Sequence, residues 1–348
     1  MYRAGRKAKE ALECARAMIA RTINAEPDEI FFTSGGTEAD NWAIDMIGTH
    51  GDIITSSIEH HAILNAAHNR FERDVKALKL MTDCHGHIVP PNESETRSLI
   101  LQNKPVMCSF MFVNNEIGTI QDLRKLFKIY DGYGLIYHTD AVQAVGHIPV
   151  DVKKLGIDML SMSAHKFNGP RGIGALYVRN GVPMYPMICG GGQERKMRAG
   201  TENVAGAVGM AVALDEAVRF MDERMAHTDS LKHRFVDACT KNNIRFATTL
   251  DDPFSNNTGI LSMRFPEVEA ESLLLLLDSF GICVSTGSAC DSKSVNISHV
   301  LSAIGLSDTD ARSTIRFSFG HQNTFEEVDY AVDSLAKCID MIRSVNTV

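Results

Sequence analysis

Several features of specialised proteins are missing from this sequence. The longest aliphatic run, Leu273 to Leu277, is far too short to cross a bilayer. The first residues are charged and rich in alanine, which predicts a helix over 4–23 rather than a signal peptide. No internal repeat or low-complexity segment is evident. These absences exclude a helical membrane protein and a repeat protein, and we expect no membrane partner.

Basic residues are not concentrated at any point in the chain. The sequence has 35 Lys and Arg against 43 Asp and Glu, which gives a net charge of -8, and no Lys/Arg run. Proteins that bind nucleic acids need a concentrated basic face to contact phosphates. We therefore predict a small-molecule ligand and no nucleic-acid partner.

The cysteines lack the repeated spacing of a disulfide framework. There are eight, scattered over the chain: Cys14, Cys84, Cys108, Cys189, Cys239, Cys283, Cys290 and Cys338. This distribution argues against a small secreted protein and predicts a reducing compartment, with the cytoplasm as the default location.

The 348 residues, 44% of them hydrophobic, are enough for one or two globular domains with a large core. Short β-like runs alternate with longer helical patterns, which predicts an α/β fold with a mostly parallel sheet. The expected strands of this part are 30–33, 53–55, 106–113, 135–137 and 174–178.

The pattern becomes continuously helical from about Asn203 to Met225. A smaller α+β unit is expected beyond it, with strands near 259–264 and 315–318. We place the domain boundary near residue 222, which gives a large domain of 1–222 and a small one of 223–348.

Polar residues follow several of these strands, where open α/β sheets bind ligands. Ser34 to Glu38 suits an anion at a helix N-terminus, or an ordinary glycine turn capped by Thr37. Glu59-His60-His61 offers an imidazole that could stack on an aromatic cofactor, although a loop histidine is the commoner case. Asn114 to Gly118 could be only a turn.

Four further residues could each take part in a specific reaction or binding contact. Asp140, in His138-Thr139-Asp140, could keep a pyridine nitrogen protonated, or merely cap a helix. Lys166, in the polar turn Ser163 to Pro170, could hold a carbonyl cofactor as a Schiff base. Cys290 ends the small-residue loop Ser285 to Cys290, where a thiol could move. Arg316 could clamp an α-carboxylate, or lie on the surface.

The order of these motifs carries more information than any one of them. They run SGGTEADN, EHHAIL, NNEIGTIQD, HTDAVQAVG, SAHKFNGPRGIGALY, GGGQERKMRAGTEN, STGSACDSKS and STIRFSFG. This succession resembles the cysteine desulfurases of the NifS/IscS type, which are pyridoxal-phosphate enzymes of the class V aminotransferase family with fold type I. The resemblance covers essentially the whole chain.

The resemblance implies a role for each motif. Lys166 would be the Schiff-base lysine, Asp140 the partner of the pyridine nitrogen, Gln143 a donor to the ring phenolate and His60 the stacking, proton-handling imidazole. The phosphate would be held by Gly36, Thr37, Ser163 and His165, with Thr201 reaching it from the second subunit of a homodimer. Asn115 would lie by the cofactor near the substrate, and Arg316 would bind the substrate carboxylate.

The implied activity is removal of sulfur from L-cysteine, leaving L-alanine and a persulfide on the nucleophile Cys290. The long polar stretch after Cys290 resembles the group with an extended catalytic loop, which implies direct transfer to an iron–sulfur scaffold or a thiolation enzyme. Rival interpretations are a selenocysteine lyase, a cysteine-sulfinate desulfinase, an aminotransferase, or a poorly active homologue that binds sulfur-carrier proteins.

The chain differs from the family pattern at its start. Relatives usually carry a further N-terminal segment with an Asp/Asn-Ala-Ala-Thr motif, so we expect the chain as given to bind cofactor and dimerise but to process cysteine poorly. Two other cysteine patterns are interpreted structurally. Cys84-His85-Gly86-His87 is predicted to be a turn rather than a metal-binding fragment, and Cys283 a buried thiol in an apolar strand.

Overall fold

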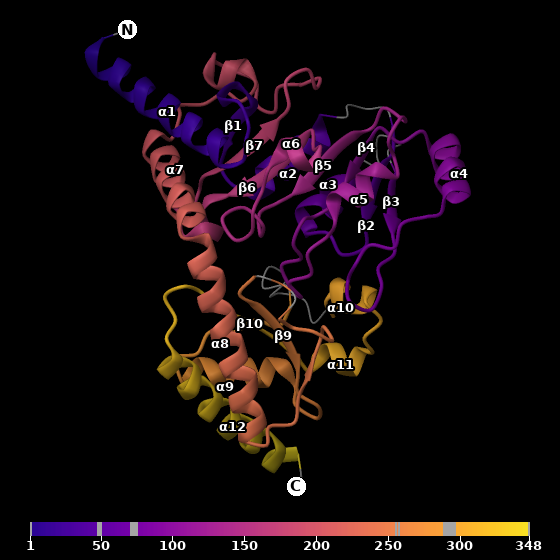
Figure 1. The fold of residues 1–348 in the computed structure, drawn as a ribbon, viewed down its shortest axis with the longest axis vertical. Helices are drawn as coiled ribbons and strands as arrows, with labels where there is room; N and C mark the ends of the chain where they lie inside the picture. Colours follow the sequence, from indigo (N-terminus) through magenta and orange to yellow (C-terminus); the bar gives the residue numbers. More distant parts are fainter. Residues whose placement is uncertain are drawn as a thin grey trace. The chain divides into compact units, whose positions relative to one another are not determined.

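The computed structural model describes residues 2–46, 51–69, 76–254, 256, 258–287 and 297–346. The chain forms two compact units (Figure 1). The first consists of residues 1–81, 89–113 and 121–221, and the second of residues 82–88, 114–120 and 222–348. The main division falls between Met221 and Asp222, and two short segments from the middle of the chain join the second unit.

The first unit contains a sheet of seven strands in the order β1-β7-β6-β5-β4-β2-β3. Their bounds are β1 Ile30–Thr33, β2 Ile53–Ser56, β3 Ala77–Leu80, β4 Met107–Ser109, β5 Ile136–Asp140, β6 Met159–Ser163 and β7 Gly174–Val178. Strands β2 to β6 pair in parallel, whereas β7 is antiparallel to both β6 and β1. Six strands therefore run in one direction, which confirms the predicted mostly parallel α/β fold.

Helices accompany this sheet along the chain. The α-helices are α1 Arg3–Thr22, α2 Gly36–Asp45, α3 His61–Asn69, α4 Glu93–Asn103, α5 Leu123–Lys128, α6 Val152–Leu155 and α7 Val204–Arg219, and the 3-10 turns are η1 Pro27–Glu29, η3 Ala164–Phe167 and η4 Gln193–Lys196. Helix α1 buries one apolar stripe that includes Leu12, Ala15 and Ile19 and packs along α7. Trp42 of α2 is fully buried in the core beside the sheet.

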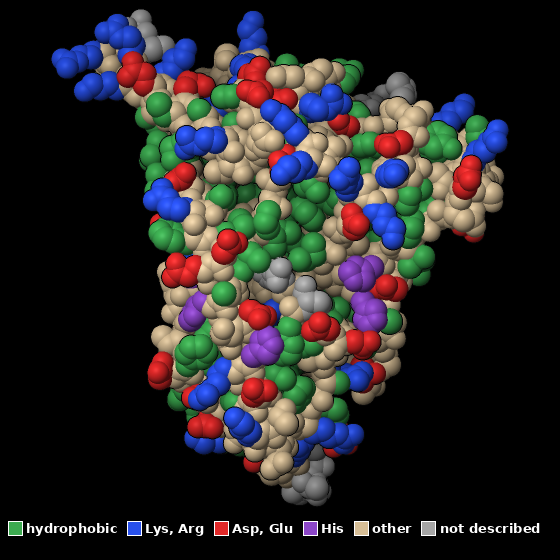
Figure 2. Space-filling model, viewed as in Figure 1, with side chains coloured by type: hydrophobic (Ala, Val, Ile, Leu, Met, Phe, Trp, Pro, Cys, Tyr) green, Lys and Arg blue, Asp and Glu red, His purple; other side chains and the backbone are tan. Residues whose placement is uncertain are grey.

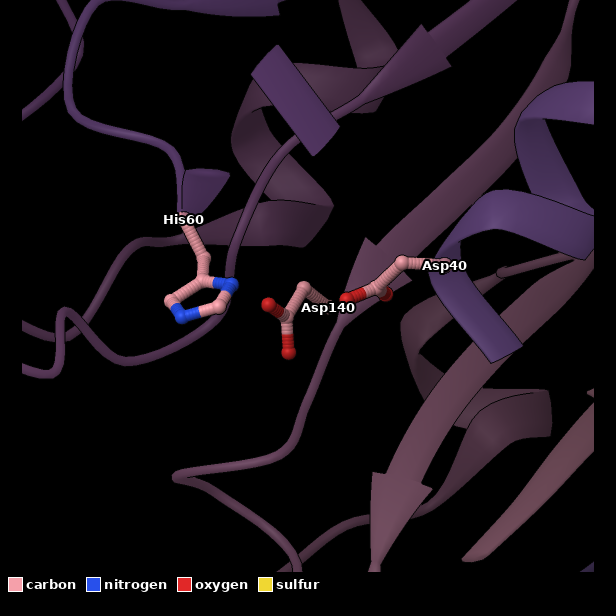
Figure 3. Close-up of side chains that lie close together, drawn as sticks. All are labelled: Asp40, His60 and Asp140. Carbon is pink, nitrogen blue, oxygen red and sulfur yellow. The ribbon is translucent and has the colours of Figure 1, made fainter. Parts of the chain in front are cut away.

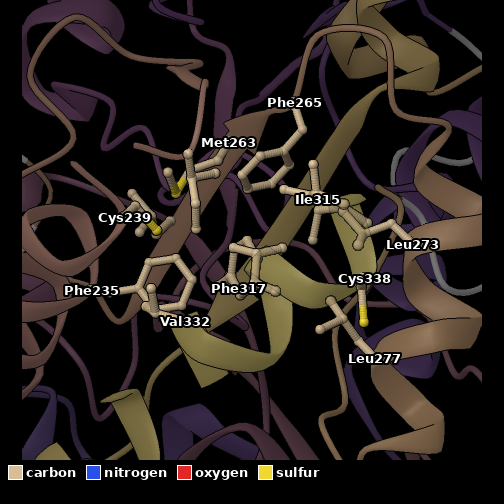
Figure 4. Close-up of a cluster of buried hydrophobic side chains, with 14 of the residues drawn as sticks. Phe235, Cys239, Met263, Phe265, Leu273, Leu277, Ile315, Phe317, Val332 and Cys338 are labelled. Carbon is tan, nitrogen blue, oxygen red and sulfur yellow. The ribbon is translucent and has the colours of Figure 1, made fainter. Parts of the chain in front are cut away.

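The second unit has its own antiparallel sheet, in the order β10-β9-β8. Its elements are α8 Met221–Lys241, β8 Ala247–Thr248, β9 Ile260–Arg264, α9 Ala270–Ser279, α10 His299–Ala303, α11 Asp308–Arg312, β10 Thr314–Ser318 and α12 Phe325–Asn346. Figure 4 shows its core, in which Phe235, Phe265 and Phe317 pack with Leu273 and Leu277. This separate core gives the unit a hydrophobic basis for folding of its own.

Three local predictions were wrong. The strand expected over 106–113 ends at Ser109, although Phe110 and Phe112 still donate backbone hydrogen bonds to the carbonyls of His138 and Asp140. The helix expected over 203–225 is interrupted at Phe220. The sequence did not predict this break, because the apolar pattern continues on both sides of Phe220. Cys283, which was expected to be buried in a strand, is exposed and lies outside any strand.

The surface carries charge of both signs. On the face shown in Figure 2, acidic and basic side chains are interspersed, and basic ones gather at the N-terminal end of α1, whose first turns include Arg3, Arg6 and Lys7. Across the described residues, every helix is too short or too polar to span a membrane.

Candidate active site

The site is built at the carboxyl edge of the large sheet. Because β1, β2, β5 and β6 run in the same direction, their carboxyl ends lie along one edge. The segments that follow them are Ser34–Thr37, Glu59–His60, Asp140–Gln143 and Ser163–Lys166. The topology therefore brings four of the predicted motifs to one edge, as expected for a ligand site in an open α/β sheet.

The N-terminus of α2 is available to an anion. Helix α2 starts at Gly36, and the capping residue Gly35 provides no side-chain hydrogen bond to its first turn. Gly36 is buried, and a Cβ added there would lie 2.6 Å from Cγ2 of Val142 and 3.5 Å from Cβ of Ser163. Backbone N–H groups of a helix start, approached this closely by a polar strand end, can bind a phosphate.

Ser163, His165 and Thr37 are the polar side chains predicted to act at this helix start, and Ser163 lies beside it. The Ser163 hydroxyl is 2.9 Å from Nδ1 of His165. Burial, and then the charges of Lys166 and Arg171, lower the pKa of His165. Thr37 is exposed in the first turn of α2. The predicted phosphate ligands Gly36, Thr37, Ser163 and His165 thus lie at or just after the carboxyl ends of β1 and β6, which lie on either side of β7 in the sheet.

Glu38 is a residue of this region that the sequence interpretation missed. It accepts the Ser34 N–H at 2.9 Å and two hydrogen bonds from Arg198, from Nε at 2.8 Å and Nη2 at 3.1 Å. Burial alone would raise the pKa of Glu38, but these hydrogen bonds lower it below the ordinary value. Glu38 therefore fixes the segment that leads to the exposed Thr201. Its place within SGGTEADN was the available signal.

Asp140 lies at the centre of a buried polar group at the end of β5. It is 5% exposed, and one of its oxygens accepts the Val142 N–H at 2.9 Å. Burial raises the pKa of Asp140, and the positive charges of His60 and Lys166 oppose that rise. An oxygen of Asp140, a ring nitrogen of His60 and an oxygen of Asp40 all lie within 4.8 Å of one another (Figure 3). This group could face a protonated ring nitrogen.

His60 and Lys166 complete the site within the first unit. His60 is half-buried, its Nδ1 accepts the Ala62 N–H at 3.1 Å, and burial lowers its pKa, so the imidazole tends to be neutral. Lys166 lies in η3, and its backbone carbonyl is 2.8 Å from Nε2 of His147. Gln143 is half-buried three residues after Asp140.

Asn115 and Arg316, the two residues predicted to bind the substrate, contact each other in the second unit. Nη1 of Arg316, on β10, donates to the backbone carbonyl of Asn115 at 2.7 Å. Arg316 also forms a backbone bridge with Ser285. Cys290, the predicted nucleophile, lies outside the described residues.

Glu116 is a second residue that the sequence interpretation missed. It is 2% exposed and accepts a hydrogen bond from the Ser298 hydroxyl at 2.5 Å. A Cβ added to Gly287 would lie 2.9 Å from Oε2 of Glu116, at a residue with φ +72°. One buried carboxylate thus contacts residues on both sides of the segment 288–296.

The segment Cys84-His85-Gly86-His87 forms the predicted turn. Gly86 has φ +77° and donates its N–H to the Asp83 carbonyl at 3.0 Å, and the Asp83 side chain accepts the N–H groups of His85 and His87. The turn joins a short bridge between Thr82 and Ile88.

Comparison of the sequence with known proteins assigns the chain to a family. Residues 1–331 match the family of class V aminotransferases. The chain belongs to the class V aminotransferase family. This class V aminotransferase is 44% identical over 349 residues to the cysteine desulfurase IscS of Dictyoglomus turgidum, and the match covers 98% of this chain and 87% of that protein.

Solved structures of related proteins have the same fold as this chain. A NifS-like protein superposes with a TM-score of 0.88 at 34% identity, covering 98% of this chain and 90% of that one. The protein SspA in complex with cysteine superposes with a TM-score of 0.77 at 31% identity, covering 93% of this chain and 90% of that one. These neighbours share the fold-type I architecture that the sequence predicted.

Enzymes of this family depend on pyridoxal 5′-phosphate, and the residues at the sheet edge fit that group. The N-terminus of α2 has no side-chain cap and suits a phosphate. The buried Asp140 suits a ring nitrogen, and Lys166, whose charge acts on both Asp140 and His60, suits an aldehyde. The residues at this sheet edge are therefore chemically compatible with the phosphate, ring and aldehyde of the family's cofactor.

Proposed function

We propose that this protein is a cysteine desulfurase that binds pyridoxal 5′-phosphate, removes sulfur from L-cysteine and releases L-alanine. The observation that carries the proposal is the cluster of Asp140 and His60, on both of which the charge of Lys166 acts, together with the uncapped start of α2, in a chain 44% identical to a cysteine desulfurase. The cysteine bound by the structural neighbour SspA supports the choice of substrate.

The residues of the first unit would hold the cofactor. The N–H groups at the start of α2, with Thr37, Ser163 and His165, would bind its phosphate, and the Lys166 amine would bind its aldehyde. Asp140 would pair with the ring nitrogen, His60 would stack on the ring and Gln143 would donate to the ring oxygen. When bound, the cofactor supplies an electron sink for carbanion chemistry at the substrate.

The remaining steps belong to side chains of this chain. Arg316, steadied by its hydrogen bond to Asn115, would bind the substrate carboxylate bidentately. The amine of Lys166 would take the α-proton and return a proton to carbon. The Cys290 thiolate would attack the substrate sulfur, so that an S–S bond forms as the C–S bond breaks, and protonation at the carbon that lost sulfur gives alanine.

Sulfur bound to Cys290 then needs an acceptor, and we propose a protein one, either an iron–sulfur scaffold or a thiolation enzyme. We also propose a homodimer in which the exposed Thr201 contributes to the phosphate site of the partner. The domains would be 1–222 for the cofactor and 223–348 for the loop with Cys290. We retain the prediction of a cytoplasmic location, which rests on the scattered cysteines.

The test is alanine production by purified protein supplied with the cofactor and L-cysteine. Without a reductant or acceptor, alanine should stop after a single turnover, because the persulfide blocks Cys290, and a reductant should restore continuous release of alanine and sulfide. Cys290→Ser should bind cofactor normally and form almost no alanine, since a hydroxyl is a poor sulfur nucleophile.

Other outcomes would count against the proposal. Turnover by Cys290→Ser at nearly the normal rate favours a selenocysteine lyase or a sulfinate desulfinase, which have less need of the thiol. Amino transfer to a keto acid favours an aminotransferase. A protein that never acquires the yellow colour of the cofactor favours a binding partner of sulfur carriers.

A further inference from the structure

Asp40 is a buried carboxyl group to which the proposed chemistry gives no role. It lies on α2, is 1% exposed, and its Oδ1 has no hydrogen-bond partner among the described residues. Figure 3 shows Asp140 between His60 and Asp40, with the carboxyl group of Asp40 pointing toward Asp140 and that of Asp140 pointing toward His60, and an oxygen of each carboxyl group lies within 4.8 Å of the other. Two buried carboxylates this close cannot both be ionised at low cost.

The surroundings of the two carboxyl groups differ. Asp140 accepts a backbone N–H, and its negative charge is favoured by a protonated His60 imidazole, where one is present, and by the positive charge of Lys166. Burial raises the pKa of Asp40 most and the negative charge of Asp140 raises it further, whereas the hydrogen bond from Ser161 opposes this rise. A single shared proton therefore belongs on Asp40, and the negative charge belongs on Asp140.

Asp40 contacts a chain of hydrogen-bonded side chains that carry no charge. The hydroxyl of Ser161 hydrogen-bonds to Asp40 and lies 3.1 Å from Nε2 of His138, whose Nδ1 is 2.8 Å from the Ser109 hydroxyl. Burial lowers the pKa of His138 to about 3, so the imidazole is neutral although it lies 3.9 Å from Asp40. It supplies a hydrogen bond to the chain and no positive charge that would ionise Asp40.

We propose that Asp40 is a positioning residue that remains a neutral carboxylic acid and so confines the negative charge of the buried pair to Asp140, where the cofactor ring nitrogen would bind. This inference rests on the proposed function for the identity of the group that faces Asp140. The protonation of the pair itself is a property of this chain with or without a cofactor.

The first test uses cofactor-free protein and infrared difference spectroscopy. Near neutral pH, Asp40→Asn should remove one carbonyl stretch of a protonated carboxylic acid and leave the carboxylate bands unchanged. Loss of carboxylate bands instead would overturn the proposal. Glu59→Gln is the matched control, because burial raises the pKa of Glu59 to about 8 and its acid band should fade as the pH passes that value. Should Asp40→Asn not fold, Asp40→Thr, which is neutral and of nearly the same volume, serves in its place.

The second test uses the cofactor-loaded protein and the pH at which its visible absorption band changes. Asp40→Ala should move this transition by admitting water beside Asp140, and Asp40→Asn, which preserves shape and neutrality, should restore it. A transition that falls by a full pH unit in Asp40→Asn would mean that Asp40 is normally an anion, and the proposal would fail. A protein without the yellow band defeats the proposed function alone, since the infrared result stands independently.

Discussion

Burial sets the charge state of the residues at this sheet edge. The lowered pKa of His138 and the raised pKa of Glu59 both arise first from loss of water, and hydrogen bonds from Ser56 and Met111 only partly offset the effect on Glu59. His138 and Glu59 are therefore neutral near pH 7, and Asp140 is the carboxyl group that we expect to be ionised. This arrangement suits a ring nitrogen that must remain protonated.

Glu59 should make the protein less stable as the pH rises. Its pKa is about 8 in the folded protein against 4.5 for an ordinary glutamate, so the folded state binds more protons between those values and stability falls as the pH increases through them. Glu59→Gln should flatten this fall, which we expect to be on the order of a few kcal/mol. Denaturant unfolding of both proteins between pH 5 and 8 checks the slope; equal slopes would show that Glu59 is ionised throughout.

Lys166 should be needed for the cofactor band and not for folding. Lys166→Ala should lack the absorption of the lysine-bound cofactor, because its covalent link is what the amine contributes. The thermal midpoint should change little, since Lys166 is only half-buried. Lys154→Ala, which removes an exposed lysine of α6, is the control and should keep the band. A retained band in Lys166→Ala would assign the link to another lysine.

Residues that carry a motif were predictable, and residues that support them were not. Asp140 and Lys166 follow apolar runs and hold positions that the family order identifies. Asp40, Glu59 and Glu116 cannot be distinguished from surface acidic residues in the sequence. Only the fold shows that each is at most 2% exposed. Their burial depends on strands far away in the chain, which no local pattern records.

At the scale of elements, a strained segment precedes the loop that carries Thr201. Glu194, Arg195 and Lys196 have φ values of 42°, 57° and 69°, a backbone region that side chains disfavour. Arg16 of α1 holds this segment through two hydrogen bonds of 2.8 Å to the Glu194 carboxylate, and the Arg195 guanidinium lies 3.9 Å above the Phe31 ring. Contacts from α1 and β1 thus stabilise a conformation that is unfavourable in isolation.

Arg16→Met should release this segment. Both partners of the ion pair are buried, and removing one leaves the charge of Glu194 without its partner, which costs about 3–5 kcal/mol of stability. Arg21→Met on the same helix is the matched control. Arg21 is 73% exposed, and its Nη2 lies 3.7 Å from Oδ1 of Asp215, so this surface ion pair contributes little to stability. Chemical denaturation measures both. A loss below about 1 kcal/mol for Arg16→Met would show that the pair does not maintain η4.

Elements were predicted best where the apolar pattern begins and ends sharply. Strand β1 and the predicted strand 30–33 have the same bounds, and β7 agrees with 174–178. Strand β4 was overestimated because Phe110 to Val113 is buried and apolar although it lies outside the sheet. Cys283 was misjudged for the opposite reason, since its apolar neighbours suggested a strand at a position that is exposed.

At the scale of the whole molecule, two segments join the second unit from within the first half of the chain. These are residues 82–88 and 114–120, which include Asn115 and Glu116. A boundary read along the sequence cannot represent such a division, because the contacts that define it join residues far apart in the chain. The α/β class itself was predictable, since the alternation of strands and helices is a regular pattern.

The proposed homodimer makes a prediction for mixed subunits. If Thr201 serves the phosphate site of the partner, a dimer of one Lys166→Ala and one Thr201→Ala subunit contains one complete site, with Lys166 from one chain and Thr201 from the other. Co-expressed and doubly tagged dimers should then bind cofactor at limiting concentration with about half the wild-type capacity. Capacity no greater than that of the two parental homodimers would place Thr201 in the site of its own chain.

The most direct test of the central claim follows the sulfur atom itself. The cofactor-loaded protein is given cysteine labelled at sulfur, without reductant, and both alanine and the labelled peptide are measured. We predict one alanine per cofactor and an equal amount of label on the peptide containing Cys290, with neither in Cys290→Ser. Alanine without label on that peptide, or label on the exposed Cys84 or Cys283 instead, would contradict the account.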